Sequence, residues 1–249
     1  MENRFPHQTV DLIACMQPQD AKIPTPEDLL TYIARVSNPS NQENWNTAPK
    51  LLKHCMDEKH VSVFDQGEMT LEVQTTLDIA MQIIRHQFKI QQFSQRYAKA
   101  DLGFVFREAR LQDKKNRQNS LDEASEDLKL WWKNKQQDIQ DLILPIYSEA
   151  LNRGIAKEQA RSILPFGNTL TRLYLKNSVR GWFFYCLTRT HVSTQLEHRD
   201  LAEKCKAHLL GVYPALEYAF ENTDAKIIER LRQENDALKK KIEALGGMA

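Results

Sequence analysis

The stretch Arg85-His86-Gln87-Phe88-Lys89-Ile90-Gln91-Gln92-Phe93-Ser94-Gln95-Arg96-Tyr97 decides how the rest of the chain is interpreted. It carries three positive charges, one histidine and four glutamines, but no aspartate or glutamate. Because the run offers its two arginines no anionic partner of its own, it suits an anion from outside, such as a phosphate. We expect a loop that Phe88, Ile90 and Phe93 hold against apolar surroundings, which favours a site over a free tail. A solvated basic loop is the alternative that these residues leave open.

The composition excludes several classes of protein. The 249 residues suffice for one large domain or two small ones, and a net charge of +1 gives no general attraction to nucleic acid or membranes. Neither GxGxxG nor GxxxxGK[ST] occurs among the 8 glycines, so a dinucleotide would not bind by the Rossmann or P-loop route. No secretion signal or bilayer-spanning run is present, and we expect a cytoplasmic protein. The cysteines form no CxxC pair, which indicates free thiols: they are Cys15, Cys55, Cys186 and Cys205.

The first third of the chain carries clear signals for secondary structure. Thr25-Pro26-Glu27-Asp28 combines a capping threonine, a proline in the first turn and two acids, which predicts a helix start. Met69, Leu71 and Val73 alternate with polar residues, which predicts a strand. The other elements expected here are a strand over residues 10–15, helices to about residue 37 and over 47–59, and a helix over 78–86 that leads into the central stretch.

The apolar pattern of the later part of the chain predicts mostly helices. Ser120-Leu121-Asp122-Glu123 has the composition of a capping box and predicts the start of a long helix to about residue 151, with a kink considered near Pro145. We expect Trp131, Leu142 and Ile143 to lie in the core. Further helices are predicted over residues 156–164, 171–188 and 194–210.

Two groups of arginines have both a structural and a functional interpretation. The basic loop over residues 107–117 is either a solvated face or a ligand contact. Four arginines in a mostly apolar region either pair with Glu197 or Asp200 or form a second set of anion ligands facing the central stretch. His191 and His198 do not complete a metal-binding set. The four arginines are Arg161, Arg172, Arg180 and Arg189.

The last residues carry a heptad pattern. Ile228, Asn235 and Ile242 share one heptad position, and leucines occupy a second position. β-branched residues with one asparagine at the first position, and leucine at the second, favour a parallel two-stranded coiled coil. The alternative is an amphipathic helix that packs on its own subunit.

These motifs resemble the flavin-dependent thymidylate synthase family, whose signature is Arg-His-Arg, seven residues, then Ser-x-Arg. Arg85-His86 and Ser94-Gln95-Arg96 match it, but Gln87 replaces the third arginine and the spacer is one residue shorter. The resemblance extends over about residues 25–222. Its other segments are residues 34–37, 60–64, 115–118 and 160–165, Asn177, and residues 189–197.

The resemblance implies an α+β fold, in which a helix-rich subunit carries a small, mostly antiparallel sheet. It implies a catalytic domain over residues 1–222, with the coiled-coil tail over 223–249, and a homotetramer with active sites at subunit interfaces. In this family, bound FAD is reduced by NADPH, and methylenetetrahydrofolate supplies one carbon to dUMP, which becomes dTMP.

Position by position, the resemblance also implies residue roles. Contacts with FAD are expected from Ser37, His60, Ser62, Arg85, His86 and Asn177. Contacts with dUMP are expected from Gln82, Gln92, Ser94, Gln95, Arg96, Arg161 and Arg189, of which Ser94, Arg96 and Arg189 would take part in catalysis. No metal is implied.

Two alternatives remain open from the sequence. The departures at Gln87 and in the spacer are compatible with a flavin- and folate-dependent 5-hydroxymethylation of dUMP. A non-enzymatic nucleic-acid-binding oligomer would use the basic loop and the coiled coil, although the near-neutral net charge disfavours it.

Overall fold

The computed structural model describes residues 4–221 together with residues 235, 237 and 238. Apart from those last three residues, which are helical, the predicted coiled coil lies outside the described residues. The chain divides into two compact units. The first comprises Met1–Gln17 and Phe64–Leu209, and the second comprises Pro18–Val63 and Leu210–Ala249.

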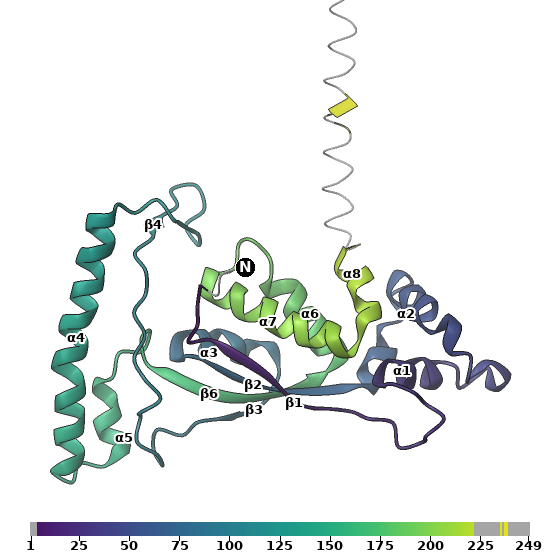
Figure 1. Cartoon of the computed structure of the whole chain (residues 1–249), viewed down its shortest axis with the longest axis horizontal. Coiled ribbons are helices and arrows are strands. Elements are labelled where there is room, and N and C mark those ends of the chain that lie inside the picture. Colours follow the sequence, from purple (N-terminus) through teal and green to yellow (C-terminus); the bar gives the residue numbers. More distant parts are fainter. Residues whose placement is uncertain (1–3, 222–234, 236, 239–249) are drawn as a thin grey trace, which may run out of the picture. The chain divides into compact units, whose positions relative to one another are not determined.

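The first unit is built on a four-stranded antiparallel sheet with strand order β1-β2-β6-β3 (Figure 1). The central strands β2 and β6 pair along their whole lengths, from Glu68 opposite Ser178 to Thr76 opposite Leu170. Together with the helices around it, this small sheet confirms the predicted α+β class. The strands are β1 (Thr9–Cys15), β2 (Glu68–Thr76), β3 (Lys89–Gln92) and β6 (Leu170–Ser178).

One face of this sheet is apolar and carries helices α3, α6 and α7 (Figure 1). As predicted, Met69, Leu71 and Val73 of β2 are buried, at 0–1% exposure. Each such side chain contributes about 1.5–3 kcal/mol by leaving water. The indole Nε1–H of Trp182 donates to the carbonyl of Met69 at 2.8 Å, which ties α6 to the strand beneath it. The helices are α3 (Leu77–Ile83), α6 (Val179–Arg189) and α7 (Leu196–Val212).

The single helix predicted over residues 171–188 is wrong, because this segment forms β6 and then α6. In β6, buried Leu173 and Leu175 alternate with exposed residues, which is the period of a half-buried strand. Ser178 then begins the helix, since its Oγ accepts the backbone N–H of Gly181 at 3.2 Å. The apolar run after residue 179 therefore belongs to a separate element.

The central stretch also differs from the prediction, because part of it is a strand and not a loop. Residues Lys89–Gln92 form β3 and pair with β6, with Ile90 opposite Leu175. Phe88 is buried between Trp182 and Tyr185, with ring centroids 4.5 and 5.1 Å away. The prediction that Phe88 anchors the stretch is confirmed.

The long helix α4 (Glu126–Asn152) lies beside one end of the sheet and continues through Pro145 (Figure 1). Its cap is Ser125, whose Oγ accepts the N–H of Leu128 at 3.3 Å, so the predicted capping box at Ser120 is wrong. The prediction that its apolar residues are core is also wrong for Trp131 and Leu142, which are 54% and 63% exposed. Nearby elements are β4 (Leu111–Gln112), β5 (Ser120–Leu121), α5 (Lys157–Ala160) and the 3₁₀ turn Arg161–Ile163.

The second unit is helical. Thr25 caps α1 as predicted, with its Oγ1 accepting the N–H of Asp28 at 3.0 Å. The carboxylate of Glu27 accepts the N–H of Ala215 at 2.7 Å, which joins the two segments of this unit. The helices of this unit are α1 (Pro26–Ala34), α2 (Ala48–Asp57) and α8 (Glu217–Glu221).

The described part of the chain also shows the state of the cysteines and bears on membrane-spanning helices and metal-ligand clusters. All four cysteines are free, as predicted. Within the described residues, no helix combines the length and the apolar character needed to cross a bilayer. Over the same residues, no cluster of three potential metal ligands occurs.

Candidate active site

The Arg85-His86-Gln87 segment is held at a sharp turn between a helix and a strand. A 3₁₀ turn over Ile84–His86 follows α3, and Gln87 then takes a left-handed conformation with φ of 57°. That conformation costs a non-glycine residue about 1–2 kcal/mol, which the buried ring of Phe88 helps to offset. The segment therefore has one orientation, and its polar side chains border a cavity.

This cavity, which we call the α6 cavity, has a volume of about 530 Å³ and lies at the N-terminal end of α6. The N–H groups of a helix N-terminus favour anions. Arg85 has no side-chain hydrogen bond or ion pair with any described residue, whereas Arg180 pairs with Asp65 at 3.0 Å. The lining residues are Asp65, Arg85, His86, Gln87, Asn177, Ser178, Arg180, Gly181, Phe184, Tyr185 and Thr188.

Three of the predicted FAD contacts, Arg85, His86 and Asn177, meet in the α6 cavity. Asn177 lies close over the first turn of α6, where its Oδ1 accepts the N–H of Ser178 at 2.9 Å. A Cβ on Gly181 would come within 2.3 Å of that side chain. Asn177 can therefore keep this position only while residue 181 is glycine.

The cavity thus combines the guanidinium of Arg85, the positive end of a helix dipole and an amide, which suits a phosphate-bearing cofactor. The N–H groups of Val179 and Gly181 are already bonded to Gly67 and Ser178, so the dipole acts there through its charge.

His86 also connects the α6 cavity to a predicted nucleotide contact. The Nε–H of Arg189, at the end of α6, donates to Nε2 of His86 at 2.6 Å. This contact requires an unprotonated Nε2, so His86 is neutral and carries its proton on Nδ1. Burial, and then the charge of Arg189, lower the pKa of His86 to about 4. His86, a predicted FAD contact, and Arg189, a predicted dUMP contact, are therefore direct neighbours.

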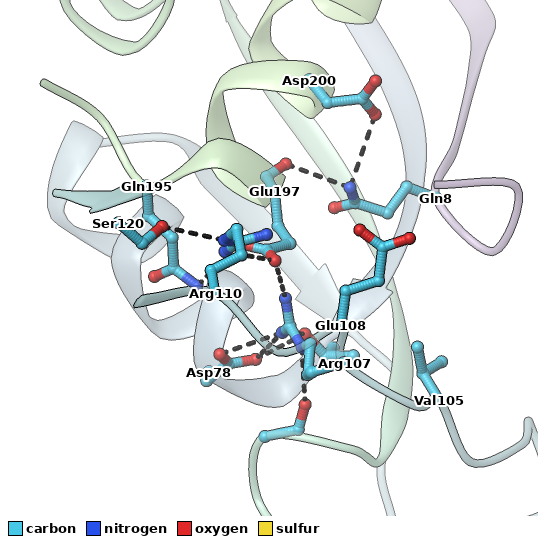
Figure 2. A network of polar contacts seen from close by, with 12 residues as sticks. Gln8, Asp78, Val105, Arg107, Glu108, Arg110, Ser120, Gln195, Glu197 and Asp200 are labelled. Atoms are coloured by element: carbon cyan, nitrogen blue, oxygen red, sulfur yellow. Dashed lines mark hydrogen bonds and ion pairs between the residues drawn. The ribbon is translucent and has the colours of Figure 1, made fainter. Parts of the chain in front are cut away.

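A buried ion-pair network lies at the start of α7 (Figure 2). The side chain of Glu197 is 2% exposed and forms ion pairs with Arg107 at 3.3 Å and with Arg110 at 2.7 Å. Arg110 also donates a hydrogen bond to this carboxylate at 2.9 Å. Arg107 also pairs with Asp78 at 2.9 Å. Burial acts to raise the pKa of Glu197, but the charges of the two arginines outweigh it, and the pKa lies below its ordinary value.

This network changes the interpretation of both arginine groups. The solvated-face prediction for the basic loop is wrong for Arg107 and Arg110, which are held inside the fold. Glu197 pairs with these two residues and not with the four arginines of the apolar region. Asp200 pairs with Lys204 at 2.9 Å.

The remaining predicted dUMP contacts are distributed over several elements. Gln82, on α3, lies between Gln195 and His198, at 2.7 and 3.0 Å. Gln92, at the end of β3, donates through Nε2 to Thr171 Oγ1 at 3.1 Å. Ser94 is exposed just beyond this strand.

Gln95, Arg96 and Arg161 are polar groups with spare bonding capacity. Gln95 is 7% exposed, and its Nε2 has no hydrogen-bond partner among the described residues. Arg96 lies in a cleft of about 590 Å³ that Lys99 and Lys157 also line, and it contacts Glu158 at 3.3 Å. Arg161 is half-buried, and its side chain makes no ion pair or hydrogen bond within the described chain.

The other three predicted FAD contacts belong to the second unit. Ser37 lines a cavity of about 420 Å³ together with Lys50 and His54. His60 and Ser62 are exposed, and the ring of His60 lies edge-on to that of His54, with centroids 6.3 Å apart. Ser37 thus borders a cavity of its own unit, and His60 and Ser62 face solvent.

Several site residues were missed by sequence reasoning. Asp65, Ser178 and Gly181 border the α6 cavity, and Gln195 and His198 hold Gln82. Ser178 directly before an apolar run was a usable signal, since serine is a preferred helix N-cap. No local signal predicts that Gln82 contacts Gln195 and His198, which lie 113 and 116 positions later in the chain.

Comparisons with known proteins place this site in a family. The family model for thymidylate synthase complementing protein (Thy1) matches residues 20–215. The chain therefore belongs to the Thy1 family, the flavin-dependent thymidylate synthases, which are methyltransferase enzymes. The sequence-based resemblance is confirmed.

Individual relatives agree with this placement. The chain is 48% identical over 198 residues to the flavin-dependent thymidylate synthase of Synechocystis sp., which covers 79% of this chain and 90% of the relative. It is 44% identical over 211 residues to a probable flavin-dependent thymidylate synthase of Paramecium bursaria Chlorella virus 1, covering 84% of this chain and 97% of the relative. The fold is similar to the UMP/dUMP methylase PolB from Streptomyces cacaoi bound with 5-Br dUMP, with a TM-score of 0.72 at 21% identity over 86% of this chain and 94% of that one.

Proposed function

We propose that this chain binds FAD and methylates dUMP at C5 to give dTMP, with methylenetetrahydrofolate as carbon donor and NADPH as reductant. The observation that carries the proposal is the 2.6 Å contact between His86, in the α6 cavity, and Arg189. It supports the proposal, because a guanidinium suited to a pyrimidine carbonyl lies next to the α6 cavity, where the flavin would bind. The names of the curated relatives support the same reaction class.

The residues of the α6 cavity would hold the flavin. Arg85 and the positive end of the α6 dipole offer positive charge to its phosphates, and Asn177 offers an amide. The flavin, when bound, supplies the hydride chemistry of the reaction. His60, Ser62 and Ser37 of the second unit are proposed as its further contacts.

The arginines of the first unit would bind and polarise the nucleotide. We assign Arg96 and Arg161 to the phosphate, since both keep hydrogen-bonding capacity that the described chain does not use. Arg189, oriented by His86, would stabilise the negative charge that develops on the pyrimidine during carbon transfer. Gln82, Gln92, Ser94 and Gln95 complete the proposed nucleotide contacts.

The proposal includes a homotetramer with active sites between subunits. The exposed apolar side chains along α4, with Leu130, Trp131 and Leu142 at 54–63% exposure, support an interface on this helix. A second subunit would also supply the contacts that bring Arg96 and Arg161 to one nucleotide. The domain limits at residue 222 and the two-stranded coiled coil of the tail remain part of this proposal.

The 5-hydroxymethylation of dUMP stays as the second candidate, because Gln87 lines the α6 cavity where the family signature has an arginine. A neutral amide there lowers the positive charge on the flavin side. A nucleic-acid-binding oligomer is disfavoured, because Arg107 and Arg110 of the basic loop are committed to Glu197.

The first experiment is the visible spectrum of the purified protein, before and after NADPH. We expect oxidised-flavin absorbance that NADPH bleaches, and a product mass that distinguishes methyl from hydroxymethyl transfer. Protein that remains colourless and shows no calorimetric binding when saturated with FAD would contradict the proposal.

The nucleotide assignment is tested with Arg161→Ala and Arg189→Ala. Removing a charge-assisted hydrogen bond to a ligand costs about 1.5–3 kcal/mol, or roughly ten- to a hundredfold in dUMP affinity. Arg189→Ala should also slow carbon transfer, because its partner gains charge toward the transition state. Unchanged dUMP affinity in variants that keep their melting temperature would refute the assignment.

A further inference from the structure

Gln82 is held on both sides by residues near the start of α7. Its Nε2 donates to Oε1 of Gln195 at 2.7 Å. Its Oε1 lies 3.0 Å from Nδ1 of His198, a residue with 0% exposure. On its other side, Nε2 of His198 is 3.2 Å from the hydroxyl of Tyr185. These residues form a hydrogen-bonded series that ends at Glu197, 3.1 Å from Nε2 of Gln195.

The carboxylate at the end forces the direction of every bond in this series. Glu197 is ionised by its two arginine partners and can only accept. Gln195 must therefore turn its NH₂ group to Glu197 and its oxygen to Gln82. Gln82 must then turn its NH₂ group to Gln195 and its oxygen to His198. His198 must donate from Nδ1 and accept at Nε2, where Tyr185 can donate.

His198 is neutral in this arrangement. Burial, followed by the charges of Arg189 and His86, lowers its pKa to about 3. A neutral imidazole has one N–H and one acceptor nitrogen, and the series uses both. His198 can therefore serve Gln82 only as a donor, which excludes the reversed orientation of the Gln82 amide.

The fixed amide has a defined remaining capacity. A glutamine amide offers two N–H donors and two lone pairs, so Gln82 keeps one N–H on Nε2 and one lone pair on Oε1. Uracil presents N3–H beside the carbonyl oxygen O4, so Gln82 Oε1 can accept from N3–H while Nε2 donates to O4. At the same two positions cytosine presents an unprotonated N3 and an amino group, which would require the reversed amide.

We propose that His198 is a specificity-determining residue that makes the site select uracil over cytosine by fixing the orientation of the Gln82 amide. It is a positioning residue, since it acts through Gln82 without touching the nucleotide. The inference rests on the proposed function, in which Gln82 contacts dUMP, and it assigns that contact to the pyrimidine.

The test compares dUMP and dCMP binding in the full-length flavin-loaded protein. His198→Leu removes the donor to Gln82, and we expect dUMP affinity to fall while dCMP affinity stays or rises, so that the affinity ratio drops by about tenfold or more. His198→Asn, whose amide nitrogen takes the position of Nδ1, should largely restore the ratio. His208→Leu is the matched control, because it removes a 2.9 Å histidine bond to the carbonyl of Val10 from the same helix.

A double-mutant cycle separates positioning from general damage. In a Gln82→Leu background, His198→Leu should no longer change the ratio, because its effect passes through Gln82. If His198→Leu does not fold, Gln195→Leu removes the support on the other side of Gln82 and must lower the ratio in its place. An unchanged ratio in a folded variant overturns the inference, even when the wild type binds dUMP. A wild type that binds no dUMP instead refutes the proposed function.

Discussion

Replacing Gly181 by alanine tests the α6 cavity with a single methyl group. The added Cβ would lie 2.3 Å from Oδ1 and Cγ of Asn177, well inside contact distance. Asn177 must therefore move away from the first turn of α6. The backbone of Gly181 has no positive φ that alanine would strain, and its N–H can keep its bond to Ser178.

We expect this substitution to weaken flavin binding but to leave the stability of the apoprotein nearly unchanged. Displacing Asn177 from its proposed contact with the flavin would remove about one neutral hydrogen bond, so flavin affinity should fall by about 1–2 kcal/mol, or roughly five- to thirtyfold. Alanine is favoured over glycine within a helix by up to about 1 kcal/mol, so the apoprotein should lose little or no stability. Flavin affinity is measured by fluorescence titration of the apoprotein, and stability by its urea unfolding.

Gly211→Ala is the matched control, because this glycine is also helical and no atom lies within 4 Å of its added Cβ. It should leave flavin affinity unchanged. If Gly181→Ala keeps wild-type flavin affinity, then Asn177 has no part in flavin binding. If the substitution instead unfolds the apoprotein, the premise that Asn177 can move away from the first turn of α6 is wrong.

Three further predictions follow from charges in the first unit. Because the pKa of His198 is lowered to about 3 in the folded protein, neutral His198 stabilises the fold fully above the ordinary histidine pKa of about 6.5, and this stabilisation is lost as the pH falls below that value. At about pH 5 the free energy of unfolding in urea should be lower by about 2 kcal/mol. A titration of His198 near pH 6.5, followed by NMR, would contradict this prediction. Glu197→Gln should destabilise the protein by about 3–5 kcal/mol, because two buried guanidinium groups lose their carboxylate; a change in unfolding free energy below about 1 kcal/mol would show that the network is replaceable. Arg85→Ala should lower flavin affinity by about tenfold or more without changing the melting temperature of the apoprotein, since its side chain has no partner among the described residues; unchanged affinity would remove it from the site.

The sequence predicts those parts of the fold that depend on local signals. The cap at Thr25 and the alternation of Met69, Leu71 and Val73 act within a few residues, and both are confirmed. The strand β6 is missed because its short alternation from Leu170 to Leu175 runs into the longer apolar pattern of α6, and only the helix cap at Ser178 marks the change of element. The pairing of this segment with β2, which lies about a hundred residues earlier, holds it as a strand.

The residues of the candidate site likewise divide into those that a local motif predicts and those that only the tertiary fold brings together. Arg85 and His86 are found from their motif, and the structure brings both into one cavity with Asn177. The roles of Arg107 and Arg110 are missed, because a basic loop gives no indication that a buried carboxylate 87 residues later will neutralise it. Long-range partners of this kind follow from the tertiary fold and have no signature in the adjacent sequence.

The arrangement of the histidines shows where the positive charge of the site resides. His86 and His198 lie with ring centroids 6.5 Å apart, and their pKa values are lowered to about 4 and about 3, first by burial and then by Arg189. Both are neutral near pH 7, and each has its single proton in a position fixed by its partners. They orient Arg189 and Gln82 without adding charge. The positive charge that faces the ligands in this part of the first unit is therefore carried by guanidinium groups, which stay protonated throughout the physiological pH range.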